Sequence, residues 1–339
     1  MVRAASITLK TNIVDAAVRE LKITADPVEH ILKARQLVVL DGALATELER
    51  RGAVLSDPLW SAKCLLEQPD LIRAIHLDYF CAGADIATTA TYQATFEGFA
   101  RRGITAEEAA RLMRSAVTLA LQARDEFWEA SSRALNRPRP LVAASVGPYG
   151  AMLADGSEYR GRYALDDRAL TDFHRPRFDL LAESGADLLA FETIPCLREA
   201  LVLAEMLRNH REMHAWMSFS CRDGQHNSEG EDIGEVVAEL QDHPQIAAVG
   251  VNCTRPEFIT PLLRSMRTRT DKPLLVYPNS GECYDAAAKT WTGSPDSLPF
   301  GELASLWYAE GARMIGGCCR TTPADIRGVL DCVARNQRA

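Results

Sequence analysis

A repeating alternation of short apolar runs and longer helical patterns constrains the fold of this chain most strongly. Each run is four to six residues long and ends in glycine, proline or polar residues, with helical periodicity before the next run. The eight runs cover residues 37–40, 85–90, 141–146, 187–191, 215–219, 247–251, 273–277 and 312–315. Four of the helical patterns cover residues 69–82, 106–130, 172–184 and 197–209. Strands that alternate with helices pair in parallel, so the chain is predicted to be an α/β protein.

Eight repeats over roughly 290 residues predict a (β/α)8 barrel, for which about 250 residues plus insertions is typical. A doubly wound sheet is the alternative. Against it, G-x-G-x-x-G follows none of the runs and G-x-x-x-x-G-K-[ST] does not occur. We expect a single barrel domain over residues 25–335, preceded by a short N-terminal extension, residues 1–24, in which residues 12–21 could form an amphipathic helix.

Composition narrows the class of protein. The chain has 339 residues, 47% of them hydrophobic and 25% charged, with a net charge of −8. No apolar run approaches the ~18–20 residues of a membrane helix, so we expect no membrane partner. The acidic balance argues against nucleic-acid binding, which needs a concentrated basic surface. Because no secretory signal is recognisable at the start, we expect a cytoplasmic protein, a monomer or homodimer that acts on small molecules.

Polar and sulfur-containing side chains gather where the predicted strands end. In a barrel the loops after the strands converge at one face and form the active site. The residues at this level are Asp41, Thr91, Tyr92, Tyr149, Glu192, Cys221, Asn252, Cys253, Asn279, Glu282, Cys283, Cys318 and Cys319. The position of Asp41 and Glu192 favours ligand binding over a structural role.

Three of the nine cysteines fall on strand ends that the topology can bring together. Cys253 follows the sixth run, and Cys318 and Cys319 follow the eighth, about 10 Å away at a strand spacing of ~4.8 Å. The preceding Gly316-Gly317 could supply the backbone freedom to turn both thiols inward. Three thiolates with one open position form a catalytic zinc pattern. Spacing alone supports packing equally well, because free cysteines are often buried.

The remaining cysteines carry weaker signals. Four lie on helices or turns away from the strand ends and are expected to serve packing: Cys64, Cys81, Cys196 and Cys332. Cys221 and Cys283 lie at the right level but lack a partner in spacing, and their roles are left open.

Several segments together resemble the homocysteine S-methyltransferase family, in family order from about residue 25 to 335. They are Val39-Leu40-Asp41-Gly42-Ala43-Leu44-Ala45-Thr46-Glu47-Leu48, Phe191-Glu192-Thr193, Gly250-Val251-Asn252-Cys253 and Gly316-Gly317-Cys318-Cys319-Arg320-Thr321. The loops over residues 145–161 and 276–291 resemble the branch that uses S-methylmethionine as methyl donor.

The resemblance implies a role for each of these motifs. Cys253, Cys318 and Cys319 would be ligands of Zn²⁺, the expected cofactor. Asp41, with the adjacent Gly42, and Glu192 would bind the homocysteine amino group. Asn252 would support the site beside Cys253, and Tyr92 would lie near the reacting sulfurs.

The expected reaction is methyl transfer to the zinc-bound thiolate of homocysteine, forming methionine. S-methylmethionine is the expected donor and S-adenosylmethionine a possible second one, and Tyr92, Tyr149 or Trp60 could face the sulfonium through a cation–π contact. Two alternatives stay open: transfer from betaine, and a non-catalytic barrel that binds zinc.

Overall fold

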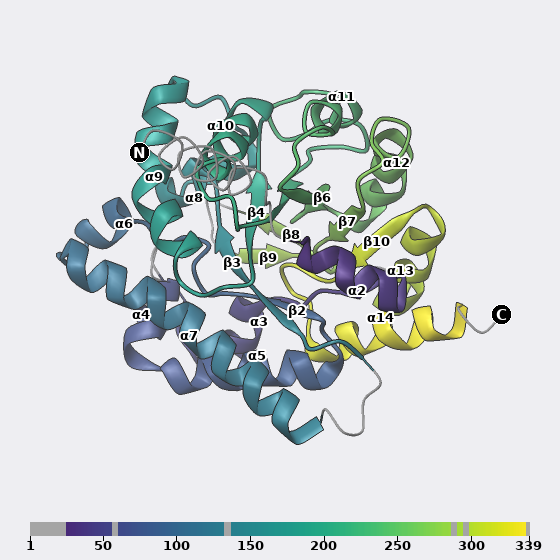
Figure 1. The fold of residues 1–339 in the computed structure, drawn as a ribbon, viewed down its shortest axis with the longest axis horizontal. Helices are drawn as coiled ribbons and strands as arrows, with labels where there is room; N and C mark the ends of the chain where they lie inside the picture. Colours follow the sequence, from purple (N-terminus) through teal and green to yellow (C-terminus); the bar gives the residue numbers. More distant parts are fainter. Residues whose placement is uncertain (1–24, 56–59, 132–136, 286–289, 294–297, 337–339) are drawn as a thin grey trace, which may run out of the picture.

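The computed structural model describes residues 25–55, 60–131, 137–285, 290–293 and 298–336. The expectations for residues 1–24, including the helix over 12–21, lie outside these residues. Eight parallel strands form one sheet, and the helices lie around it (Figure 1). The strands are β1 (Val38–Val39), β2 (Ile86–Thr88), β3 (Leu141–Val146), β4 (Leu188–Ile194), β5 (Ala215–Phe219), β6 (Ile246–Asn252), β7 (Leu274–Tyr277) and β10 (Ala312–Ile315). Each of the eight predicted runs contains or overlaps one of these strands.

The sheet closes on itself. Its strand order is β1-β10-β7-β6-β5-β4-β3-β2, and a parallel bridge between Leu40 and Ile86 joins the two ends. The Asp41 amide donates to the Ile86 carbonyl at 3.0 Å, and the Asp85 amide donates to the Val39 carbonyl at 2.6 Å. The (β/α)8 barrel is therefore confirmed, and the doubly wound sheet is wrong.

The predicted helices are present with shifted ends. The pattern over 69–82 forms α5 (Pro69–Ala82), and the pattern over 106–130 forms α7 (Ala106–Ser131). The third begins five residues earlier than predicted, as α9 (Asp167–Ala182), because the Asp166 side chain caps it by accepting from the Ala169 amide at 2.8 Å. The fourth is α10 (Leu197–Leu207). The others are α2 (Pro27–Arg35), α3 (Leu44–Arg50), α4 (Trp60–Glu67), α6 (Phe96–Ala100), α8 (Tyr149–Leu153), η1 (Ser157–Tyr159), α11 (Ile233–Ala238), α12 (Pro256–Met266), α13 (Phe300–Ala309) and α14 (Pro323–Asn336).

The barrel interior changes character along its axis. Alternate residues of each strand point inward, and those toward the N-terminal ends are apolar, as Leu188 and Trp216 are. Val28 and Ile31 of α2 pack into this apolar group and close that end of the barrel. Toward the C-terminal ends the same strands present Thr88, Ser145, Glu192, Ser218 and Tyr277. The polar level is therefore confined to the end where an active site is expected.

A two-stranded hairpin after β7 was not predicted. Strand β8 (Cys283–Asp285) pairs antiparallel with β9 (Thr290–Thr292), and Tyr284 lies opposite Trp291. Strands of three residues are too short for an alternating pattern to reveal them. Among the described residues, no helix is both long enough and apolar enough to cross a membrane.

Candidate metal centre and active site

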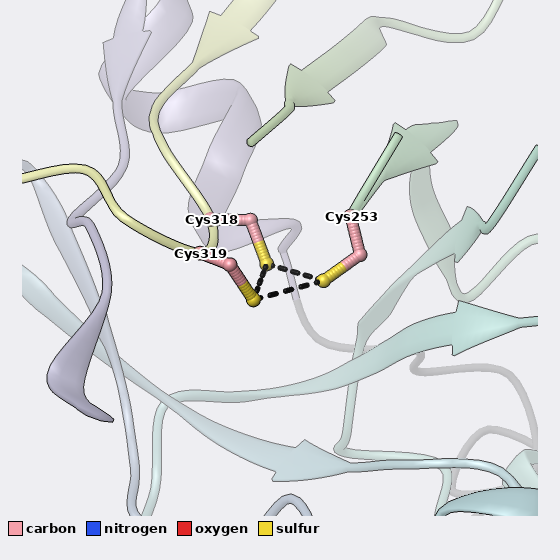
Figure 2. Close-up of side chains that lie close together, drawn as sticks. All are labelled: Cys253, Cys318 and Cys319. Carbon is pink, nitrogen blue, oxygen red and sulfur yellow. Dashed lines mark hydrogen bonds between the residues drawn. The ribbon is translucent and has the colours of Figure 1, made fainter. Parts of the chain in front are cut away.

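Three cysteine sulfurs meet at the C-terminal end of the barrel. Cys253 extends from the end of β6, and Cys318 and Cys319 lie on the loop after β10, with their sulfurs pointing to a common centre (Figure 2). The Sγ–Sγ distances are 2.7 Å between Cys253 and Cys318, 3.6 Å between Cys253 and Cys319, and 3.9 Å between Cys318 and Cys319. The last two are close to ~3.8 Å, the edge of a tetrahedron with zinc–sulfur bonds of ~2.3 Å.

The end of β7, which lies between β6 and β10, holds this arrangement together. The Cys253 amide donates to the Tyr277 carbonyl at 3.2 Å, and the Cys318 amide donates to the next carbonyl, that of Pro278, at 2.8 Å. Cys253 itself has a positive φ of 47° and Arg320, which follows the pair, one of 69°. Strained non-glycine residues of this kind cluster at functional sites, where the surrounding structure holds them in place.

The two glycines before the cysteine pair serve a different purpose from the one predicted. Neither Gly316 nor Gly317 has a positive φ, so backbone freedom is not what the site requires of them. A Cβ at Gly316 would lie 2.7 Å from the Asp41 carbonyl oxygen, and one at Gly317 would lie 2.3 Å from Thr321 Oγ1. The glycines are needed because the backbone after β10 passes directly against its neighbours.

The sulfur trio fits a soft metal ion. The pKa of Cys253 lies well below the ordinary value because hydrogen bonds from Cys318 and Cys319 stabilise its thiolate. Donating to Cys253, together with burial, raises the pKa values of Cys318 and Cys319. A bound cation would remove the need for these protons, and three thiolates leave a tetrahedral ion one further position.

Below the sulfurs, Glu192 is part of a buried hydrogen-bond network. Its Oε1 accepts a hydrogen bond from Ser145 Oγ, and its Oε2 accepts one from the Tyr277 hydroxyl at 3.1 Å. Burial raises the pKa of Glu192 to about 7, with the charge of Cys253 adding to the effect and the two hydroxyl donors opposing it. Trp216 Nε1 in turn donates to Tyr277 at 3.0 Å.

Asp41 is the second buried carboxylate at this level. It accepts hydrogen bonds from the Thr88 amide at 2.8 Å and from the Thr88 hydroxyl at 3.1 Å. Burial raises the pKa of Asp41 well above its usual range, and the charge of nearby Glu192 raises it further. Gly42, beside it, is packed too closely for a side chain, since a Cβ there would lie 2.9 Å from the Tyr79 ring. Two buried carboxylates close enough to oppose each other's ionisation attract a cation.

Asn252 is fully buried and bonded within the protein. Its Oδ1 accepts from the Thr193 amide at 2.7 Å and from Ser218 Oγ at 2.9 Å, and its Nδ2 donates to Thr193 Oγ1 at 2.8 Å. Thr193 has a positive φ of 60°. Asn252 therefore stabilises the strained turn after Glu192 and precedes Cys253 directly in the chain.

Two aromatic residues adjoin the sulfurs, and sequence reasoning identified only one of them. Tyr92, which was predicted, has its ring against Gly147 and interacts electrostatically with Cys253. Tyr159, on η1, was missed, and its hydroxyl donates to Cys253 Sγ at 3.6 Å. Glu158, the residue before Tyr159, was also missed; its side chain is buried. Both lie in the loop after β3, and their distance from the strand end hid them.

The other expectations for cysteines and aromatics have mixed outcomes. Cys64 and Cys196 are buried as predicted, whereas Cys81 is exposed on α5, so its assignment to packing is wrong. Cys221 lies outside the sulfur trio, and its thiol interacts with Thr254. Tyr149 packs edge to face against Tyr163 and Phe173. The side chains of Trp60, Cys283 and Cys332 lie outside the described part of the structure.

Fold and site together define a closed (β/α)8 barrel with three cysteines that could hold a metal ion at the C-terminal ends of its strands, near two buried carboxylates. The family model for homocysteine S-methyltransferase matches residues 38–333, and the chain belongs to this family.

Individual relatives agree along nearly the full chain. Homocysteine S-methyltransferase YbgG of Bacillus subtilis is 53% identical over 304 residues, which are 90% of this chain and 96% of the relative. Homocysteine S-methyltransferase of Escherichia coli is 49% identical over 302 residues, 89% of this chain and 96% of the relative. The metallated crystal structure of the Escherichia coli homocysteine methyltransferase MmuM superposes with a TM-score of 0.81 at 46% identity, covering 90% of this chain and 99% of that one.

Proposed function

We propose that this protein is a zinc-dependent methyltransferase that moves a methyl group from a sulfonium donor, S-methylmethionine, to the thiol of homocysteine. The observation that carries the proposal is the convergence of Cys253, Cys318 and Cys319 at the mouth of the barrel, directly above buried carboxylates. Solved and named relatives with the same barrel support the acceptor, and one solved relative is described as metallated. The barrel domain is proposed to span residues 25–335. A monomer or homodimer in the cytoplasm stays a prediction.

The cysteine trio would hold the zinc ion. A free thiol has a pKa near ~8.5 and reacts as the thiolate, and bound zinc would lower the pKa of the homocysteine thiol so that the thiolate is present at neutral pH. Tyr277 and Pro278 fix the protein side of the site, because their carbonyls hold the amides of Cys253 and Cys318.

Asp41 and Glu192 are proposed to bind the homocysteine amino group. Both carboxylates are buried, and burial raises the pKa of each. A substrate ammonium group would neutralise part of this charge and supply hydrogen-bond donors. Because both groups are fixed by hydroxyl and amide donors, the acceptor would be held in one orientation, which favours in-line transfer.

The proposed transfer is a single displacement at the methyl carbon. The homocysteine thiolate forms a bond to the methyl carbon, the carbon–sulfonium bond breaks, and its electron pair stays on the donor sulfur. An anion and a cation become two neutral thioethers, so with S-methylmethionine both products are methionine. Charge is lost in the transition state, and a site closed to water favours such a step.

A donor panel tests the reaction. Zinc-loaded, reduced protein is given homocysteine with S-methylmethionine, S-adenosylmethionine or betaine, and methionine formation is measured. We expect the highest rate with S-methylmethionine. Transfer from betaine alone would overturn the donor assignment, and the absence of transfer from all three would overturn the proposed function.

A substitution pair tests the metal centre. Cys318→Ala should lose bound zinc and turnover together, because a three-thiolate site loses one ligand. Cys221→Ser is the matched control, a partly buried cysteine outside the trio that should keep both. Full activity with stoichiometric zinc in Cys318→Ala would refute the ligand assignment. In cobalt-substituted protein a change of spectrum on adding homocysteine is expected, whereas a closed, non-catalytic site would show none.

A further inference from the structure

Glu158 is a buried carboxylate that the acceptor site does not use. Its side chain is 9% exposed, and its Oε2 accepts no hydrogen bond from the described residues. Asp41 and Glu192, by contrast, each have hydroxyl or amide donors. A buried carboxylate oxygen without a partner is costly, because the charge loses its hydration and gains no compensating contact.

The backbone holds Glu158 firmly in place. It lies on η1, which packs against α8 and β4, and its carbonyl accepts from Ser220 Oγ at 2.8 Å. Gly150 allows the close approach, since a Cβ there would lie 2.5 Å from the Glu158 nitrogen. The carboxylate therefore belongs to a built site, and the position of its chain is determined by contacts on two sides.

Glu158 faces the reacting end of the active site. Its charge interacts with Cys253, and it acts in the same way on the hydroxyls of Tyr92 and Tyr159. The next residue, Tyr159, reaches Cys253 Sγ at 3.6 Å. Burial raises the pKa of Glu158 to about 7, with Cys253 and Asp155 adding to the effect and Arg160 opposing it. Arg160 is mostly exposed and pairs with Asp155 at 3.5 Å, so it compensates the buried charge weakly.

We propose that Glu158, together with the rings of Tyr92 and Tyr159, forms the subsite for the cationic sulfur of the methyl donor. The inference rests on the proposed function and names the residue that recognises its donor. A sulfonium carries charge but no N–H or O–H group. A carboxylate oxygen without hydrogen-bond donors, close to the side chains of Tyr92 and Tyr159, suits such a cation better than it suits an ammonium group.

This role predicts a specific kinetic signature. The sulfonium charge disappears in the transition state, so a counter-charge stabilises the bound donor more than the transition state. Glu158 therefore contributes to donor binding and to the discrimination between sulfonium and thioether, and little to kcat. The demethylated product is neutral at sulfur, and loss of this attraction favours its release.

The experiment compares wild-type protein with Glu158→Gln, which removes the charge and keeps the shape. S-methylmethionine and methionine share the same amino and carboxyl groups. With homocysteine saturating the acceptor site, methionine competes with S-methylmethionine for the donor site, so the ratio of the methionine inhibition constant to the donor KM isolates the sulfonium. We expect Glu158→Gln to lower the preference for S-methylmethionine at least about tenfold, to raise the donor KM by a similar factor and to leave kcat unchanged or higher. Asp172→Asn, which removes an exposed charge on α9 that pairs with Arg168, should leave the ratio unchanged.

The other outcomes are also decisive. Equal weakening of both ligands would place Glu158 at the donor's ammonium group, and a weaker homocysteine titration with unchanged donor binding would place it in the acceptor site. Either result, or an unchanged ratio, overturns the inference. Glu158→Asp keeps the charge and should retain part of the preference. If wild-type protein transfers methyl from none of the donors, the proposed function fails. If wild-type protein transfers methyl groups but Glu158→Gln keeps the wild-type preference for S-methylmethionine over methionine, only this inference fails.

Discussion

At the scale of the residue, the mouth of the barrel concentrates ionisable side chains that would be more stable in water. Glu192 is the clearest case, because burial raises its pKa from 4.5 to about 7 and the negative charge of Cys253 adds to the effect. Such a site stores an electrostatic cost in the free protein that a cationic substrate relieves. Binding strength at this level is obtained at the expense of folding stability.

Glu192→Gln should therefore make the metal-free protein more stable at high pH. The folded state holds its proton up to about pH 7 and the unfolded state only to about 4.5, so wild-type stability falls as the pH rises between these values. At pH 8 the variant should gain up to about 3 kcal/mol, and near pH 4.5 the gain should vanish. Urea unfolding at pH 8 and pH 4.5 measures this difference, and Glu205→Gln, at an exposed position on α10, is the control. A gain that is independent of pH would contradict the explanation.

Some of these residues could be predicted and others could not. Asp41, Tyr92, Glu192 and Cys253 follow or end a strand closely, so the barrel topology alone places them at one level. Glu158 lies several residues beyond the end of β3, and its position depends on how η1 packs, which is a tertiary contact that no periodic pattern encodes.

At the scale of the element, β6 and β7 lie so close together that one added side-chain carbon would prevent them from pairing. Gly250 lies in the middle of β6, and a Cβ there would lie 1.8 Å from the Leu275 carbonyl oxygen of β7. The same strand pair carries the Cys253 amide and its acceptor, the Tyr277 carbonyl. The geometry of the metal centre therefore depends on a glycine that touches no sulfur.

Gly250→Ala should destabilise the protein by more than about 3 kcal/mol, because backbone and not a flexible side chain would have to move. Zinc affinity should fall with stability, since β6 carries Cys253. Gly328→Ala is the matched control: it lies on α14, where a Cβ would meet Gly301 at an ordinary 3.5 Å. Thermal unfolding and metal analysis report both effects. An unchanged melting temperature in Gly250→Ala would contradict this prediction, because it would show that the backbone of β7 can move to accommodate the new side chain.

Element boundaries were predictable to different degrees. Helix α5 begins and ends where its pattern predicts because Pro69 opens it and Gly83, with φ of 116°, closes it. Helix α9 has an N-cap signal at its start, Asp166, which was overlooked in the sequence. The β8–β9 hairpin consists of strands too short to alternate visibly.

At the scale of the whole molecule, α2 completes the barrel. Val28 and Ile31 are fully buried among inward-facing strand residues such as Leu188 and Met314. The run over residues 37–40 predicted the first strand, but the helix before it was not predicted, because its pattern is weak and its importance comes from what it covers. The eightfold alternation predicted the architecture, but the helix α2 that fills the base of the barrel could not be predicted from it.

Ile31→Ala should lower the free energy of unfolding by about 2–5 kcal/mol, the usual cost of such a cavity. The homocysteine KM should stay unchanged, because the substituted side chain lies at the end of the barrel away from the cysteines. His30→Ala, on the exposed side of the same helix, should alter neither quantity. Denaturant unfolding and initial-rate kinetics separate stability from binding, and a large rise in KM would show that the two ends of the barrel are coupled.

The closed base of the barrel has a consequence for the order of events in a turnover. With α2 sealing the N-terminal end, both reactants enter and both products leave through the same mouth. The carboxylates proposed for homocysteine lie below the sulfurs, whereas Glu158 and Tyr159 lie on the loop after β3 and Tyr92 follows β2. In the proposed reaction the donor would cover the acceptor, so homocysteine would bind first and the methionine formed from S-methylmethionine would leave first. Such an ordered sequential mechanism would give intersecting double-reciprocal plots. Methionine, which would be formed from both reactants, would then inhibit by binding at the acceptor site and at the donor site.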